Sequence, residues 1–245
     1  MIDAIRSEWI KLSTVSVTWV LAIIALAFPL VVTILTAVFA EDVFSGQDLA
    51  GLVAGLTIVS AMLLAVVAAI AVTSEFGHGT IRPTFAALPD RIRPLLAKPI
   101  VQVAVTLALT VATVVSCWIL GAVLSGDSPS LGDGTALPAL VGVVALAVGL
   151  TLLGYGLGLL IRNSPAAICI LLLWPLIAEG LIAGLLSAAG AEGAVKFLPY
   201  SAGFNMALTD TDPDSFGRVV GGLYFFAWVI VIGVLGVVSA RRRDA

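Results

Sequence analysis

The chain has 245 residues, of which 60% are hydrophobic and 11% are charged, with a mean hydropathy of +1.16 and a formal net charge of −3. A soluble domain is expected to carry about 25% charged residues, so this composition excludes an ordinary soluble protein. The apolar residues are concentrated in runs long enough to cross a bilayer, which is typical of an integral membrane protein.

The first dozen residues are the first predicted element. Ile2, Ile5, Trp9 and Leu12 recur at helical spacing, while the charged residues fall mostly on other sides of the turn. The pattern predicts a short amphipathic helix lying in the membrane interface, with Trp9 and Lys11 as interfacial residues. The alternative is a frayed polar lead-in to the first span.

Six apolar runs of spanning length follow, since a helix needs roughly 20 mostly apolar residues to cross the bilayer. They cover about residues 17–40, 50–73, 100–124, 136–161, 165–182 and 219–240. The predicted fold is therefore all-α, with one transmembrane domain over residues 1–245. Cys117 and Cys169 lie inside apolar runs near opposite faces, so both are predicted to be free thiols.

Basic residues are distributed unequally between the two sides of this predicted bundle. Ten of the twelve lie on one side: Arg6, Lys11, Arg82, Arg91, Arg93, Lys98, Arg162, Arg241, Arg242 and Arg243. The positive-inside rule places this side in the cytoplasm. We therefore expect a multi-pass protein of the cell (plasma) membrane with both termini in the cytoplasm.

The stretch between the fifth and sixth spans is the longest predicted non-cytoplasmic segment, and part of it remains apolar. Apolar pieces below spanning length are typical of re-entrant or interfacial segments. We expect one or two such pieces here, broken at residues 190–193 and at Pro199.

Most catalytic chemistry is missing from the sequence. His78 is the only histidine, no G-x-S-x-G or H-E-x-x-H pattern occurs, and none of the three lysines follows glycine as the nucleotide-binding P-loop requires. Gly154, Gly156 and Gly158 lie within the fourth span and are interpreted as close helix packing. The chain is predicted not to be an enzyme, to bind no metal or cofactor itself, and to have no nucleic-acid partner.

The stretch between the second and third spans is the most informative part of the sequence. It leaves the second span at Glu75, passes a glycine-rich turn at residues 77–79 and continues to Lys98, with prolines at positions 83, 89, 94 and 99. Because proline is disfavoured inside helices, we expect short helical pieces that form a stiff, charged elbow against the membrane. Such an elbow could transmit a push from a soluble partner to both spans.

This elbow resembles that of the type-2 permease family, the membrane subunits of ATP-binding-cassette (ABC) exporters. The matching residues, in order, are Glu75, Gly79, Thr80, Ile81, Arg82, Pro89, Arg91 and Lys98. The resemblance extends to the start at residues 7–12, to the six spans and to Leu198-Pro199 before the last span.

The resemblance implies a permease that dimerises, as a homo- or heterodimer, and docks separate ATPase subunits that bind ATP and Mg²⁺. Glu75, Gly79, Thr80, Arg82, Arg91, Arg93 and Lys98 would then be coupling residues. Arg82, Arg91 and Arg93 would be the first candidates for contacts with the ATPase. Alternatively, these arginines only face anionic lipid headgroups.

Glu179 is an ionisable residue inside the fifth predicted span, about 22 Å from its cytoplasmic start at 1.5 Å per residue. Such a group in lipid is costly, so we consider that it lines the export path or gates its outer mouth. The alternative is that Pro175 ends the regular helix and Glu179 already faces water.

The leading hypothesis is therefore the permease subunit of an ATP-driven exporter, with the transport path between two permease chains. An ion-coupled secondary transporter that uses Glu179 is the alternative, although such proteins usually show internal repeats. An intramembrane enzyme and a membrane anchor for a larger complex fit the sequence less well. The apolar spans suit a lipid-like or amphipathic cargo but do not identify it.

Overall fold

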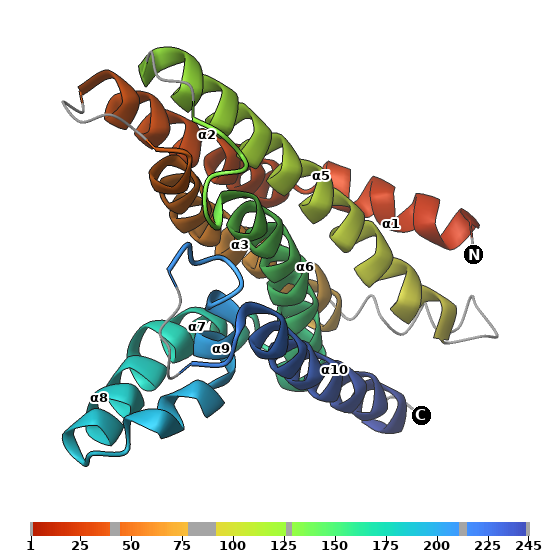
Figure 1. Cartoon of the computed structure of the whole chain (residues 1–245). Helices are drawn as coiled ribbons and strands as arrows, with labels where there is room; N and C mark the ends of the chain where they lie inside the picture. Colours follow the sequence, from red (N-terminus) through yellow and green to blue (C-terminus); the bar gives the residue numbers. More distant parts are fainter. Residues whose placement is uncertain (1, 40–44, 78–91, 126–128, 211–214, 244–245) are drawn as a thin grey trace.

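The structure is a computed structural model that describes residues 2–39, 45–77, 92–125, 129–210 and 215–243. Side chains are described in these ranges except at residues 92–94 and 241–243. This part of the chain is mostly helical and contains no strand, which confirms the all-α fold class (Figure 1).

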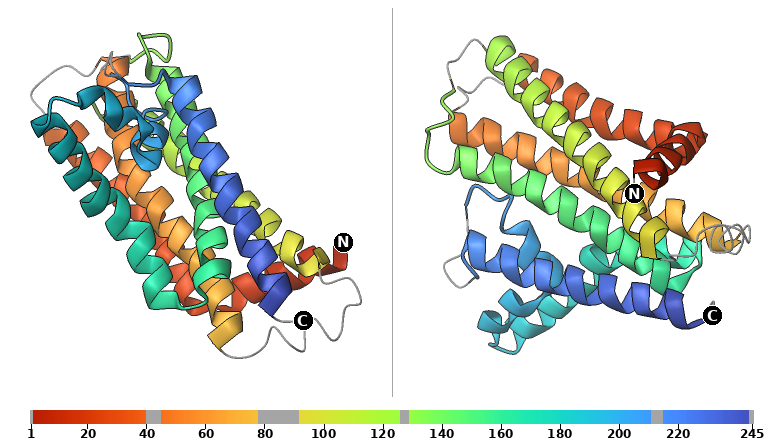
Figure 2. Two further views of the ribbon diagram at one scale, coloured as in Figure 1. Left: turned by 90° about the horizontal axis from the view of Figure 1, so that it is seen from below. Right: turned by 90° about the vertical axis from the view of Figure 1, so that its right-hand side faces the viewer.

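Among the described residues, six helical segments are long and apolar enough to cross a membrane, as predicted. In chain order they are α2 (Ser16–Phe39), α3 (Gly46–Gly77), α5 (Ile92–Ser125), α6 (Ala136–Ile161), the continuous run α7 (Ser164–Leu173), η1 (Trp174–Glu179) and α8 (Gly180–Ala188), and α10 (Arg218–Arg243). The N-terminal helix and the end of α10 lie at the same end of this bundle (Figure 2). An even number of spans requires that arrangement.

A separate helix, α1 (Ile2–Thr14), precedes the first span. The chain turns at Val15, and the indole Nε1 of Trp19 donates a 2.7 Å hydrogen bond to the carbonyl of Ser13 across the turn. From there α1 runs back across the beginning of α5 (Figure 2). The predicted N-terminal helix therefore exists; its location in the membrane interface stays a prediction.

Helices α3 and α6 pack side by side through the centre of the molecule. A methyl group at Gly154 would collide with the carbonyl of Ala65, and one at Gly158 would come within 3.1 Å of the Ala69 carbonyl oxygen. Gly156 faces α10 instead, where an added Cβ would lie 3.1 Å from Gly233. The glycines of the fourth span therefore allow close helix packing, as the sequence suggested.

The helix α5 differs from the expected elbow. The prolines at 94 and 99 were predicted to divide this stretch, with the third span starting near residue 100, but one helix runs from Ile92 to Ser125. Pro94 lies in the first turn, where proline is tolerated because the amide would be unpaired anyway. Pro99 lies in the interior, where it leaves the carbonyl of Leu95 without its helical donor.

At all three prolines in the interiors of described spans, the carbonyl that lacks its helical donor is hydrogen-bonded in the same way. They occupy positions 29, 99 and 175, and each frees the carbonyl four residues earlier. In each case a hydroxyl from a neighbouring element donates to that carbonyl: Ser60 to Ala25, Tyr155 to Leu95, and Tyr200 to Leu171. The helices therefore continue through their prolines without an unpaired backbone group.

Two short helical pieces lie between α8 and α10, as predicted. They are η2 (Glu192–Phe197) and α9 (Pro199–Phe204), and Gly190 precedes them with a φ of +72° that favours glycine. α9 packs against α6, η1 and α10, and its Tyr200 is buried. Whether these pieces enter the membrane as re-entrant segments stays a prediction.

Candidate functional site: a charged cluster at the junction of α1, α3 and α5

Four charged side chains from three helices meet where α3 ends and α5 begins, and we call them the charged cluster. Lys98 of α5 places its Nζ 2.5 Å from Glu8 Oε2 and 3.0 Å from Glu75 Oε1. Lys11 of α1 places its Nζ 2.7 Å from Glu8 Oε1 and 3.0 Å from the same Glu75 oxygen. Each lysine therefore bridges both carboxylates, and the cluster ties α1 to the ends of both spans that flank residues 78–91.

Local sequence explains how each member reaches this point. Glu8 and Lys11 are three residues apart on α1 and therefore share one face of that helix. Glu75 lies in the last turn of α3, and Lys98 lies within the first two turns of α5. The backbone thus brings both ends of the predicted elbow to one place.

The charged cluster is largely withdrawn from water. The side chains of Glu8, Lys98 and Glu75 are 6%, 10% and 17% exposed, whereas Lys11 is 43% exposed. Two carboxylates balance two ammonium groups, so the buried group carries no net charge. Removing one member would leave a buried charge unpaired, which is far costlier than losing an exposed ion pair.

Lys11 remains protonated through the physiological range. Partial burial alone would lower its pKa, but the hydrogen bond to Glu8 and the charge of Glu75 outweigh burial and raise the pKa from its ordinary 10.5. A raised lysine pKa means that its contribution is complete at any pH below about 10.5 and is lost only as the pH rises beyond it.

A buried polar line continues from the charged cluster into the third span. Lys98, Gln102 and Thr106 follow one another at four-residue spacing on α5 and are all buried. Gln102 Nε2 lies 3.5 Å from the Ala68 carbonyl of α3, and the hydroxyls of Thr106 and Thr151 of α6 are 2.9 Å apart. These bonds connect the start of α5 to the central pair of helices.

Arg162 is a second basic group at this end of the bundle. Its guanidinium lies 4.5 Å from the ring centroid of Phe76, beside Glu75 in the chain, and its Nη2 donates to the Ser239 carbonyl of α10. It therefore joins the ends of α3, α6 and α10. The sequence identified Arg162 only as a topology-determining charge.

The structure brings together part of the predicted coupling set. Glu75 and Lys98 pair directly, and Lys11, predicted as an interfacial residue, joins them. Gly79, Thr80, Arg82 and Arg91 lie outside the described residues, and of Arg93 the structure describes only its place in the first turn of α5. Glu8 was missed as a site residue, although its spacing from Lys11 and the apolar face of α1 gave a signal that it faces the protein.

Glu179 is buried in the second half of the fifth span, far along the chain from the charged cluster. It is 2% exposed, and its two oxygens accept hydrogen bonds from the amides of Tyr200 and Ser201 at 2.9 and 2.8 Å and from the Ser201 hydroxyl at 2.9 Å. The alternative that Glu179 already faces water is wrong, because its carboxylate is buried and caps the first turn of α9. A role in the path or outer gate stays a prediction.

The part of the chain that the structure describes contains no group of three or more side chains suited to hold a metal ion. The charged cluster links α1 to the end of α3 and to the start of α5, so a displacement of one of these helices can be passed to the others.

Comparison with known proteins identifies a family. The family model described as "ABC-2 family transporter protein" matches residues 4–178, which include most of α1 and the first four spans. No curated protein matches the chain. The chain belongs to the ABC-2 family of transporter proteins and is a multi-pass membrane permease.

Proposed function

We propose that this chain is the membrane-spanning permease subunit of an ATP-driven ABC exporter. Two permease chains would form the path, and separate ATPase subunits would bind and hydrolyse ATP with Mg²⁺. The elbow from Glu75 to Lys98 would face the cytoplasm, and the ATPase would push on it there. The observation that carries the proposal is the charged cluster, which joins both ends of that elbow to α1.

The geometry suits transmission of a push. A force on the elbow reaches the last turn of α3 and the first turns of α5, where Glu75 and Lys98 are bonded to each other and to α1. The ends of α3 and α5 therefore move with α1 instead of sliding past it. Since α5 continues as one helix to Ser125, displacement of its start tilts the whole third span.

The alternative, an ion-coupled transporter that uses Glu179, receives less support. A carrier carboxylate must exchange its proton or ion during transport. Here both carboxylate oxygens accept hydrogen bonds from α9. Proton or ion exchange at Glu179 would break these bonds and leave the first turn of α9 without its cap. We therefore favour a structural role for Glu179 near the outer mouth of the path.

Co-purification tests the proposal. The permease would be extracted from native membranes in mild detergent, and co-purifying proteins would be quantified by mass spectrometry. We expect a P-loop ATPase at a stoichiometric ratio, lost when Arg91 and Arg93 are both changed to Glu. The matched control reverses Arg242 and Arg243, which lie on the same predicted side but outside the elbow, and should keep the ATPase. A stable assembly without any ATPase would overturn the proposal.

A further inference from the structure

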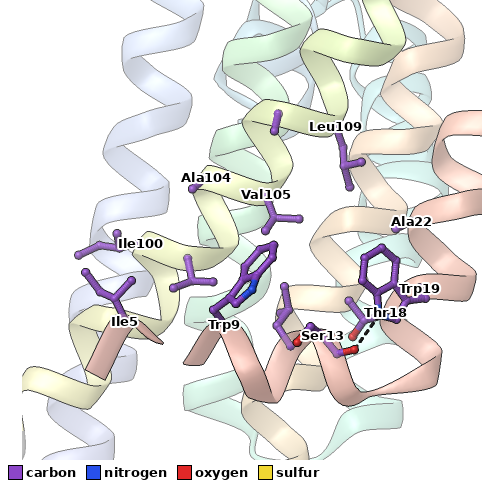
Figure 3. Close-up of a pocket in the computed structure, with 13 residues that line it drawn as sticks. Ile5, Trp9, Ser13, Thr18, Trp19, Ala22, Ile100, Ala104, Val105 and Leu109 are labelled. Atoms are coloured by element: carbon purple, nitrogen blue, oxygen red, sulfur yellow. Dashed lines mark hydrogen bonds between the residues drawn. The ribbon is translucent and has the colours of Figure 1, made fainter. Parts of the chain in front are cut away.

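An apolar cavity of about 430 Å³ lies between α1, the start of α2 and the first half of α5 (Figure 3). Ile5 and Trp9 of α1 form one side, Trp19 of α2 forms another, and α5 contributes small residues that include Ala104 and Ala108. We call this cavity the α1 slot. Its volume is within the range of small-molecule sites.

The length of the α1 slot matches one leaflet of a bilayer. Its wall on α5 runs from Ile100 to Leu109, and nine steps of 1.5 Å give about 14 Å. Half of a hydrocarbon core of about 30 Å is about 15 Å. The slot therefore begins at α1 and ends near the middle of the membrane.

The lining selects an apolar occupant. The Ser13 hydroxyl donates to the Ile10 carbonyl at 3.0 Å, and the Trp19 indole donates to the Ser13 carbonyl at 2.7 Å. These polar groups are thus already bonded within the protein, and apart from Thr18 the remaining lining is aliphatic and aromatic. A polar cargo would lose its water without gaining partners.

Arg6 directly follows Ile5, a lining residue of the slot, on α1. Arg6 is exposed on α1, three residues before Trp9 and therefore on a neighbouring part of the same helix surface. Lys11 is bonded to Glu8 and Glu75, whereas no ion pair to Arg6 is found among the described residues. A guanidinium in this position suits a phosphate group.

We propose that the α1 slot holds one acyl chain of a phospholipid from the cytoplasmic leaflet, with the lipid phosphate bound by Arg6. The inference rests on the membrane orientation of the proposed function but not on the ATPase. A helix lying in the interface displaces headgroups and leaves space on its hydrocarbon side. The bound chain fills that space and supports α1, which in turn carries the charged cluster.

Native mass spectrometry of protein loaded from phosphatidylglycerol vesicles and then washed in detergent tests this proposal. We expect about one retained phospholipid per wild-type chain. Filling the slot with Ala104→Leu and Ala108→Leu should lower retention at least tenfold. The matched control is Ala112→Leu, which changes an exposed alanine of α5 outside the slot and should retain the lipid. Arg6→Gln should lower retention of phosphatidylglycerol while sparing the fold.

A second measurement uses the wild-type protein and so does not depend on the variants folding. A phospholipid with a photoreactive diazirine in its acyl chain would be loaded, and the cross-linked peptides would be mapped. We expect cross-links concentrated on the α1 slot rather than on the exposed apolar faces of α8 and α10. Equal retention by the filled variant, or cross-links spread over all exposed spans, would overturn the proposal. So would an Ala104→Cys variant that cross-links to a second copy of the chain.

Discussion

Glu8 is the residue on which the charged cluster depends most. Its two carboxylate oxygens lie 2.7 Å from Lys11 Nζ and 2.5 Å from Lys98 Nζ, and its side chain is 6% exposed. Glu75 also touches both lysines but through one oxygen, at 3.0 Å in each case. The shortest contact of the charged cluster, between Glu8 and Lys98, therefore joins α1 to α5.

Replacing Glu8 with Gln is expected to destabilise the protein because it leaves Lys98 partly unpaired in a buried position. The loss should be about 2–3 kcal/mol, as for hydrogen bonds to charged groups, or about 5 to 10 °C in Tm. Thermal unfolding in detergent measures it. Asp3→Asn, an exposed acid in the first turn of the same helix, is the control and should shift Tm by less than about 2 °C. Equal shifts for the two variants would show that the charged cluster contributes no special stability.

The sequence predicted which charged residues matter but not which residues they bond. Glu75 and Lys98 were recognised from their places in a family pattern, yet Glu75 bonds Lys11, 64 residues earlier, and Lys98 bonds Glu8, 90 residues earlier. Glu179 was recognised as costly in lipid, but its partners, Tyr200 and Ser201, lie on a short helix that follows the turn at Gly190. No local periodicity encodes such pairings, since they depend on how the helices pack.

The helices show how proline is accommodated in the spans. Each interior proline leaves one carbonyl without its helical donor, and the hydroxyl of a serine or tyrosine from a neighbouring element donates a hydrogen bond to that carbonyl. Position 99 is the most consequential because it directly follows Lys98. The Tyr155 bond to Leu95 fixes the first turns of α5 against α6, where a push on the elbow would arrive.

A double-mutant cycle between Tyr155 and Pro99 tests this arrangement. Tyr155→Phe alone should cost about 1–3 kcal/mol, since it leaves a buried carbonyl without a donor. In a Pro99→Ala background the amide of residue 99 can bond Leu95 itself, so the same change should cost less than about 1 kcal/mol. Chemical denaturation in mixed micelles measures both values.

The control for that cycle is Tyr224→Phe, whose hydroxyl donates to the Phe197 carbonyl at an exposed site. Its effect should be small and independent of Pro99→Ala. Additive effects of Tyr155→Phe and Pro99→Ala would contradict the compensation between hydroxyl and proline.

Boundaries were the part of the fold that the sequence predicted least well. The fourth span was predicted at residues 136–161 and observed at Ala136–Ile161, because polar residues stop it on both sides. The third span began earlier and the fifth ended later than predicted, at Ile92 and Ala188. In both cases a proline or a charge was predicted to end the helix, whereas neighbouring elements supply the hydrogen bonds that let it continue.

For the whole molecule, α3 and α6 form a packed centre, while α2, α5, α10 and the fifth span surround it and expose most of their surface. In the most apolar stretch of the fifth span only 17% of the residues are buried, compared with 67% in α3. Such exposed apolar spans are covered by lipid or by another permease chain, in keeping with the proposed dimer. Helices α1 and α8 lie at opposite ends of this bundle (Figure 2).

The central claim is that the charged cluster carries movement of the ATPase to α1 and to the spans. Hydrogen–deuterium exchange of the permease–ATPase complex, with and without trapping by ADP and vanadate, tests it most directly. In the wild type we expect trapping to change exchange in α1 and in the first turns of α5 together, with little change in α8. In Glu8→Gln the change in α5 should persist while that in α1 is lost. Unaltered exchange in both α1 and α5 upon trapping would contradict the claim.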